Sequence, residues 1–461
     1  MGIKLFLAAV VIGATVLSTP ATAAGADASP PSGPNPYLSF LPDQSHVDYA
    51  AWRTYLARQS GARLTAAAPE GPVVHENEPP GVLGRNDTRA TAERVPGFGS
   101  GRRQTVRIVG QLASSESTVD VDVYRVELRA GDVFAATVQG EAHRLTIFDP
   151  AGVEVQGSAQ DFSVLYPPSS PLPHSGNAIA DHVASVSGTH YLAVSEGSGA
   201  YQLDVQAHRP PLERELRPQT VFLDFDGASV DMGIFGIDPS PGVRALSPFS
   251  TFLPRWGLTP ADEPALVRQI MRTVRENLIE DVQRRSKNPT ARLILLNSLE
   301  HPDTFGRENV SRVVVGGTAD EAGFVTVGIS QSIDPGNFAQ EETALVLLDL
   351  VSQPAGPAVS LNTYLAPQSN RIEFIGRALG NVISHEIGHY LGSWHTDPAN
   401  ALVSLMDDGG TNIPGFFGVG PDGIGGTADD TDNDLTSDTY RPSEGFTGTE
   451  DTLNRTAFGL S

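Results

Sequence analysis

Two histidines near the carboxyl end of the sequence have the spacing of metal ligands on a helix. His385 and His389 are four residues apart, and the apolar residues before them recur at helical spacing. Both imidazoles should therefore project from one helix face, separated by about 6 Å along the axis. Side chains placed in this way reach one Zn²⁺ at about 2.0–2.1 Å each. The chain contains no cysteine, so any metal must be held by His, Asp or Glu.

A third histidine joins this site only if the helix ends before it. His395 lies six residues past His389, which on an ideal helix is about 240° round and about 9 Å further along. Gly392 stands where the chain can turn back, because glycine adopts a positive φ without strain. We therefore predict that His385, His389 and His395 hold one catalytic zinc ion, with Gly392 ending the helix.

Glu386 adjoins the first histidine and has the chemistry of a general base. It lies about 100° round the helix from His385, too poorly aligned to bind the same metal. Zinc held by neutral imidazoles lowers the pKa of a bound water to about 7. We expect Glu386 to take a proton from this water as it attacks a scissile carbonyl, and to pass the proton to the leaving amine.

Residues 385–395 read H-E-x-x-H-x-x-G-x-x-H, and this pattern resembles the metzincin clan of zinc endopeptidases. The resemblance implies a secreted bacterial zinc peptidase that acts on protein or peptide substrates. It also implies a turn with a methionine below the metal, a role that Met406 fits. Several families of the clan place a tyrosine ligand two residues after this methionine. The present chain has Asp408 there, so no tyrosine ligand is assigned.

The segment 420–434 is dense in short carboxylates and glycines. Ca²⁺ takes six to eight oxygen ligands from carboxylates and turn carbonyls. The segment does not fit an EF-hand loop but resembles calcium loops of exported bacterial proteins. The alternative is a solvated acidic loop. If calcium binds, with a structural role, the candidate ligands are Asp422, Asp429, Asp430, Asp432 and Asp434.

Two different patterns divide the chain that must position these residues. Residues 214–461 mix strand-like runs with a helix that carries Leu266, Ile270 and Val274 on one stripe, which predicts an α/β (α+β) metzincin-like catalytic domain. Residues 83–208 alternate with period two between turn signals, which predicts an antiparallel β-sandwich. Its entry, with Glu78 and the run Asn86-Asp87-Thr88, resembles the bacterial pre-peptidase C-terminal domain. The predicted fold class is therefore multidomain.

The amino-terminal residues are predicted to be a targeting signal followed by a spacer. A short positive region, an apolar run and small residues ending at Ala23 indicate a secretory signal peptide over residues 1–23. No later stretch is long and apolar enough to span a membrane. Residues 24–82 are rich in Ala, Pro and Gly and are assigned as a pro-segment or linker. We expect a secreted, extracellular chain that acts as a monomer.

The composition narrows the possible partners and leaves three functional classes. Lys and Arg number 31 against 54 Asp and Glu, a net charge of −23, and no basic stripe that would bind nucleic acid is visible. The leading function is zinc endopeptidase. The alternatives are a calcium-dependent extracellular binding or adhesion protein and a zinc hydrolase of a non-peptide amide or ester. An intact Glu386 disfavours the adhesion protein, because a structural zinc site needs no general base.

Overall fold

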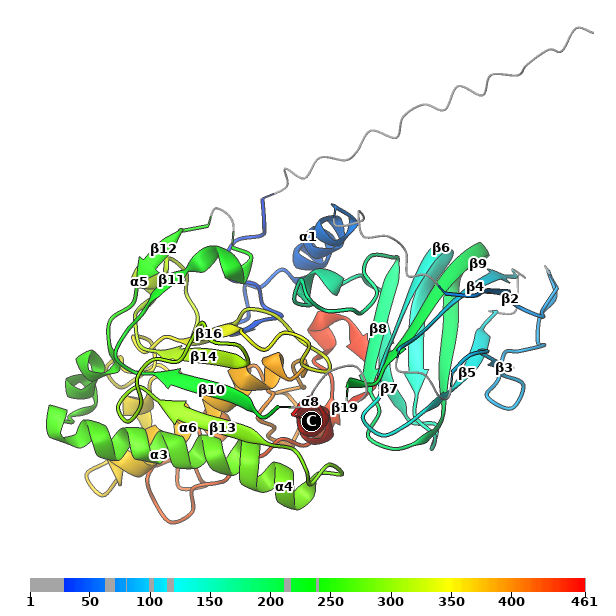
Figure 1. Cartoon of the computed structure of the whole chain (residues 1–461). Coiled ribbons are helices and arrows are strands. Elements are labelled where there is room, and N and C mark those ends of the chain that lie inside the picture. Colours follow the sequence, from blue (N-terminus) through cyan, green and yellow to red (C-terminus); the bar gives the residue numbers. More distant parts are fainter. Residues whose placement is uncertain are drawn as a thin grey trace, which may run out of the picture.

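The computed structural model describes residues 29–62, 71–79, 81–98, 103–113, 120–210, 217–237 and 240–460. An all-β region lies beside a region of mixed helices and strands (Figure 1). The predicted mixed α+β architecture with several sheets is therefore confirmed. The predicted signal peptide, residues 1–23, lies outside the described residues.

The all-β region is built around two long antiparallel strands, β6 (Val133–Phe148) and β9 (Gly188–His208). Their ladder continues through a register shift between Gly140 and Ala142, where a bulge lets β6 bend. The first half of β6 pairs with β8 and the second half with β7. The remaining strands are β2 (Val73–His75), β3 (Glu93–Arg94), β4 (Arg103–Leu112), β5 (Asp122–Leu128), β7 (Glu154–Ser158) and β8 (Ala178–Val183).

The mixed region contains a six-stranded sheet in the order β1-β15-β16-β14-β10-β13. The four strands at its centre and far edge are parallel, whereas β15 is antiparallel to β16. Parallel strands are typical of sheets whose two faces are both covered by other elements. The residues of such strands are therefore mostly apolar rather than alternating. Their bounds are β10 (Gln219–Asp224), β13 (Leu293–Asn297), β14 (Val310–Val315), β15 (Gly328–Ser330) and β16 (Thr343–Val346).

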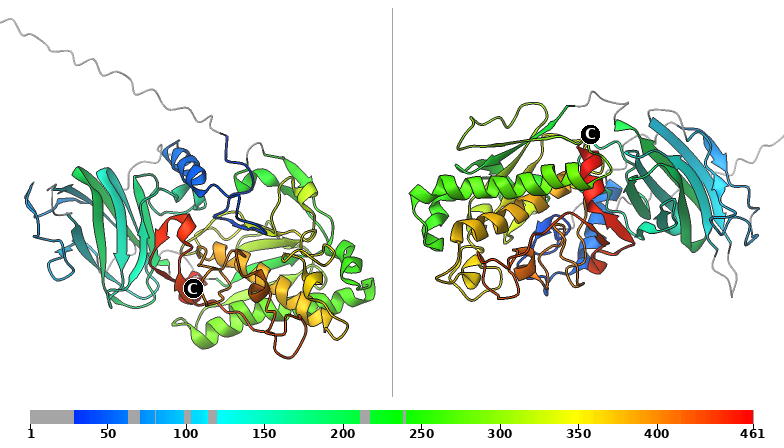
Figure 2. Two further views of the ribbon diagram at one scale, coloured as in Figure 1. Left: turned by 180° about the vertical axis from the view of Figure 1, so that it is seen from behind. Right: turned by 90° about the horizontal axis from the view of Figure 1, so that it is seen from below.

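Two helices lie side by side under this sheet, α3 (Glu263–Arg275) and α6 (Arg371–Tyr390) (Figures 1 and 2). Leu266, Ile270 and Val274 are fully buried, so the predicted apolar stripe of α3 is confirmed. A π turn over Glu276–Glu280 joins α3 to α4 (Asp281–Arg285). The buried helix α6 carries the two closely spaced histidines, so the sheet and α3 hold the candidate site from one side.

Residues 29–62 are packed into the molecule. Their strand β1 (Ser39–Phe40) is the edge of the six-stranded sheet, and α1 (Tyr49–Ala62) follows it. Tyr37 and Phe40 have no exposed surface, and Trp52 is 2% exposed. An unpacked linker, one of the two readings of residues 24–82, would leave these aromatic side chains in water. The described part of this stretch is therefore a structural element of the fold.

The last part of the chain joins the two regions. Strand β18 (Phe446–Thr447) pairs antiparallel with β7 and so extends the all-β sheet. Helix α8 (Thr452–Gly459) places the buried Arg455 in an ion pair with Asp181 of β8. Glu450 also lies near Arg455, with its Oε1 3.3 Å from Nε. A shared strand and a buried ion pair tie the all-β region to the mixed region.

Removal of the Asp181 carboxylate should destabilise the whole chain. In Asp181→Ala the buried Arg455 loses its closest counter-charge, and breaking a buried pair in this way costs about 3–5 kcal/mol. Glu141 is exposed on β6, so Glu141→Ala should change stability by no more than about 0.5 kcal/mol. Urea unfolding followed by circular dichroism measures both. Equal stability of the two variants would contradict the importance of this ion pair.

Candidate metal centre

The three predicted histidines come together in the interior. Ligand atoms of His385, His389 and His395 lie within 4.8 Å of one another, and all three side chains are fully buried. The ring centroids are 4.9 Å apart for His385 and His389, 5.1 Å for His385 and His395, and 4.8 Å for His389 and His395. Helix α6 carries His385 and His389, and the chain turns back after the helix to bring His395 beside them.

Gly392 makes that return possible. Its φ is +93°, in the left-handed region, and its backbone N–H donates to the carbonyl of His389 at 2.9 Å. A Cβ at this position would lie 2.5 Å from the Cα of Pro335. A larger residue would therefore be strained both by its backbone conformation and by this neighbour.

The hydrogen bonds of the three rings leave one nitrogen of each free. Nδ1 of His385 lies 2.8 Å from the carbonyl of Leu405, and Nδ1 of His389 lies 2.8 Å from the carbonyl of Ser393. Nδ1 of His395 lies 2.6 Å from Oε1 of Glu444. Each Nδ1 thus donates a proton, which leaves a lone pair on Nε2. The three Nε2 atoms are buried and have no hydrogen-bond partner.

Burial also keeps these rings neutral. It lowers the pKa of His385 and His389 well below the ordinary value, and it lowers the pKa of His395 to about 4. Neutral imidazoles with a bonded Nδ1 and a free Nε2 are the form that binds zinc. The residues present therefore fit a three-histidine zinc site.

Glu386 is placed beside the histidines but outside their cluster. Its Oε2 accepts a hydrogen bond from Ser330 Oγ at 2.8 Å, and its Oε1 is buried without a partner. A Cβ on Gly328 would lie 2.1 Å from Oε1, so strand β15 passes close to this carboxylate. Burial raises the pKa of Glu386 well above its ordinary value. One oxygen is thus held and the other is left free for a proton.

Met406 lies directly against the helix between the two ligands. A Cβ on Gly388 would be 2.4 Å from the Met406 sulfur, so glycine permits this close contact. The Met406 carbonyl accepts a hydrogen bond from Thr396 at 2.9 Å, which joins the methionine turn to the residue after His395. The structure thus places Met406 against the helix that carries His385 and His389.

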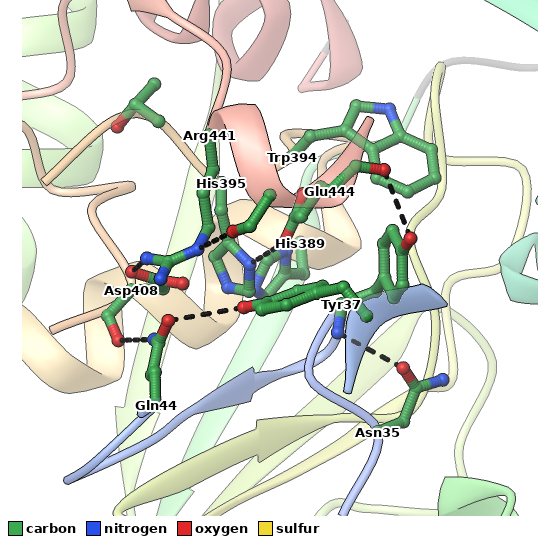
Figure 3. Close-up of polar contacts among 12 residues, drawn as sticks. Asn35, Tyr37, Gln44, His389, Trp394, His395, Asp408, Arg441 and Glu444 are labelled. Carbon is green, nitrogen blue, oxygen red and sulfur yellow. Dashed lines mark hydrogen bonds and ion pairs between the residues drawn. The ribbon is translucent and has the colours of Figure 1, made fainter. Parts of the chain in front are cut away.

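A polar group that the sequence did not predict surrounds His395. Glu444, Asp408 and His395 have ligand atoms within 4.8 Å of one another, and Asp408 is paired with Arg441 (Figure 3). Glu444 is 49 residues from His395 along the chain, so no spacing rule could have indicated it. Glu444 fixes the orientation of the His395 ring and Arg441 balances the neighbouring carboxylate.

Glu444→Ala should weaken zinc binding without unfolding the chain. The substitution removes the acceptor for His395 Nδ1, and loss of such an outer partner typically costs about 10–100-fold in metal affinity. Competition with a fluorescent zinc chelator measures the change. Glu308, whose side chain is 83% exposed, provides the control Glu308→Ala. Equal zinc affinities for the two variants would show that Glu444 does not orient the ligand.

The five candidate calcium ligands do not form one group. Asp422 and Asp429 share the hydroxyl of Thr427, at 3.1 and 2.6 Å. Asp430 bonds Arg377 at 2.9 Å instead. Asp432 and Asp434 lie within 4.8 Å of Glu276, and burial with the Asp432 charge raises the pKa of Glu276 to about 8. Another acidic group, not predicted as a metal site, lies in the all-β region and contains the buried Glu78 and Asp120 with the half-buried Asp87.

Calcium binding by the acidic segment remains a prediction. If Ca²⁺ binds the folded chain alone, it stabilises by mass action, by about 2.7 kcal/mol at one hundred times the dissociation constant. Thermal melts in calcium should then lie several degrees above melts in EGTA. Asp432→Asn with Asp434→Asn should remove that difference if the Glu276 group is the site. Superimposable melts of the parent chain would instead favour the solvated loop.

The amino-terminal segment, residues 29–62, lies over the metal centre. The ring of Phe40 is 5.5 Å from that of His385, and the Tyr37 hydroxyl donates to the carbonyl of Glu444 at 3.1 Å. Figure 3 shows the Tyr37 hydroxyl directed at Glu444, the residue that bonds His395. Together with the surrounding core, these residues leave the histidines and Glu386 no exposed surface.

Comparison with known proteins leaves the family open. No protein-family model matches the chain, and no curated protein matches it. Two solved periplasmic inhibitors of g-type lysozyme resemble a quarter of it, PliG of Aeromonas hydrophila and PliG of Salmonella Typhimurium. The first is 12% identical, with 25% of this chain and 96% of that chain covered and a TM-score of 0.17. The second is 16% identical, with 25% and 99% covered and the same TM-score of 0.17.

Likenesses of this size identify neither the family nor the function.

Among the described residues, the structure contains no helix with the length and apolarity needed to cross a membrane.

Proposed function

We propose that this chain is a secreted zinc-dependent endopeptidase. The observation that carries the proposal is the cluster of three buried histidines whose Nε2 atoms have no partner, followed on the same helix by Glu386, whose Oε1 is also buried without a partner. Buried polar atoms without partners are costly, so a fold retains them where they serve binding or catalysis. Three neutral imidazoles and one adjacent carboxylate are the groups that metal-assisted hydrolysis requires.

The three histidines bind the metal in this proposal, and Glu386 transfers the proton. A bound zinc ion supplies a Lewis acid that polarises a carbonyl and acidifies water. His385, His389 and His395 hold the ion, and their Nδ1 partners fix the tautomer that makes this possible. Glu386 accepts a proton at Oε1 and returns it to the leaving group, while Ser330 holds Oε2 in place.

The neighbouring strand favours a peptide over a small amide or ester as substrate. Strand β15 passes against Glu386, and its flanking backbone N–H groups already bind carbonyls of an extended chain, that of β1. If β1 moved away, β15 would become a sheet edge beside the general base, and such an edge is suited to hold a polypeptide by main-chain hydrogen bonds. The adhesion protein remains the weaker alternative, because it gives no role to Glu386.

Hydrolysis of casein tests the proposal. We expect zinc-loaded chain to cleave casein, 1,10-phenanthroline to abolish cleavage, and the non-chelating 1,7-isomer to leave it unchanged. Both the parent and a chain carrying Gln44→Ala with Arg53→Ala are assayed, because these residues hold the amino-terminal segment over the site. If both zinc-loaded chains leave casein intact, the proposal is wrong. Cleavage of nitrophenyl esters alone would then favour the non-peptide hydrolase.

A further inference from the structure

The third histidine lies between two segments that pack against the all-β region. His395 directly follows Trp394, and its Nδ1 lies 2.6 Å from Oε1 of Glu444 (Figure 3). Glu444 is followed closely by strand β18, which pairs with β7 through Phe446 opposite Ser158. The other two ligands lie on helix α6, which packs against α3 and the strands of the mixed region. His395 and its carboxylate partner therefore lie at the junction of the two regions.

Gln160, in the loop after β7, bonds the residue that orients His395. Its side-chain amide donates to the carbonyl of Glu444 at 2.7 Å, and Tyr37 donates to the same carbonyl. The backbone of Gln160 is held in turn, because its carbonyl accepts from the N–H of Ile179 on β8 at 3.0 Å. Among the described residues, Oε2 of Glu444 has no hydrogen-bond partner. The backbone position of Glu444, which Gln160 helps to fix, therefore decides where Oε1 meets His395.

Phe162, in the same loop, packs against the residue before His395. Its ring meets that of Trp394 edge-on at 4.5 Å and that of Phe446 edge-on at 4.8 Å. The rings of Trp394 and Phe446 are themselves 4.8 Å apart, and all three are buried. Edge-to-face contacts at these distances are favourable and depend on orientation. A side chain of the all-β region thus helps to fix the position of Trp394, next to the third ligand.

Charged side chains hold the backbone at the same place. The N–H of Trp394 donates to both carboxylate oxygens of Glu450, at 3.2 and 3.0 Å. Glu450 lies 3.3 Å from Nε of Arg455, and Arg455 pairs with Asp181 of β8. The backbone just before His395 is therefore connected to the all-β sheet by this chain of contacts as well.

We propose that the all-β region is part of the metal centre, with Gln160 and Phe162 as positioning residues that hold His395 in the orientation in which it binds zinc. The inference rests on the three-histidine zinc site of the proposed function. The first two ligands need no such help, because one helix sets their common face. His395 lies beyond the end of that helix, so contacts with other segments decide where its Nε2 points. The metal centre then belongs to both regions and not to residues 214–461 alone.

Four variants of the full-length chain form two matched pairs. Gln160→Ala removes the bond to Glu444, and Gln139→Ala removes a side-chain bond within the all-β region. Phe162→Leu removes the aromatic contacts, and Phe134→Leu makes the same change in the separate core of the all-β region. Leucine fills most of the volume of phenylalanine, so both chains should fold, which thermal melts verify.

Zinc affinity is measured by competition with a fluorescent chelator. The geometry of the site is followed by visible absorption of the cobalt-loaded chain, because the bands of Co²⁺ change with the arrangement of its ligands. We expect Gln160→Ala and Phe162→Leu to bind zinc at least about threefold less tightly than the parent and to shift the cobalt bands. This loss is smaller than the roughly 10–100-fold expected for a direct partner of a ligand. Both controls should match the parent.

A double variant separates positioning from general stability. Gln160 acts through the Glu444 carboxylate, so Gln160→Ala should not weaken zinc binding further when it is added to Glu444→Ala. A general loss of stability would instead weaken binding equally in both backgrounds, and that result would overturn the positioning role.

The remaining outcomes distinguish the inference from the proposed function. Parent-like zinc affinity and cobalt bands in Gln160→Ala and Phe162→Leu, or equal losses in the two controls, would overturn the inference and leave the zinc site standing. A parent chain that binds zinc no more tightly than His389→Ala would overturn the zinc site itself, and the inference with it.

Discussion

Glu386→Gln should give a folded, zinc-loaded protein that cleaves peptide substrates at least about 100-fold more slowly than the parent, because loss of a general base costs about 10²–10⁴ in rate. Glutamine keeps the shape of the side chain and an oxygen that accepts from Ser330. It has no basic oxygen to replace the unpartnered Oε1. The variant therefore separates proton transfer from metal binding. Initial rates on a quenched fluorescent peptide measure the effect.

Glu373→Gln is the matched control for this variant. Glu373 lies in the first turn of the same helix, where its partly exposed side chain pairs with Arg377. The same chemical change at this position should leave both zinc content and rate near those of the parent. Both substitutions are also made in the Gln44→Ala, Arg53→Ala background. A Glu386→Gln chain that retains zinc and cleaves at the parent rate in that background would disprove the proposed mechanism.

His389→Ala should remove the zinc ion. The change leaves two imidazoles, and loss of a ligand should exceed the roughly 10–100-fold in affinity that loss of an outer partner costs. Peptide cleavage should disappear with the metal. His301 is exposed in the same region of the chain, so His301→Ala controls for the loss of any histidine. Metal analysis of both variants after dialysis gives the answer, and undiminished zinc in His389→Ala would refute the three-histidine site.

The local part of the candidate site could be predicted because helical geometry determines it. The spacing of His385 and His389 sets their common face, and the stripe of Leu266 and Ile270 sets the buried side of α3. Gly392 followed from the same geometry, since His395 returns only after a left-handed turn. These relations involve a few neighbouring residues, so the sequence contains them directly.

The remainder of the site depends on contacts between distant residues. Glu444 bonds His395 although the two are 49 residues apart in the sequence. The Ser330 hydroxyl bonds the main chain and the carboxylate of Glu386, which is 56 residues away in the sequence. The composition of residues 24–82 indicated a spacer, yet Tyr37, Phe40 and Trp52 are buried. These aromatic residues were the available sign of packing. The density of aspartates near the carboxyl end did not reveal that Arg377 pairs with one of them.

A zinc titration of metal-free chain tests the central claim most directly. The chain carrying Gln44→Ala and Arg53→Ala is stripped of metal, zinc is added in steps, and casein cleavage is measured at each step. A single three-histidine site predicts that the rate rises in proportion to added zinc and levels off at about one equivalent per chain. Cleavage that needs no zinc, or a chain with one bound zinc that leaves casein intact, would contradict the account.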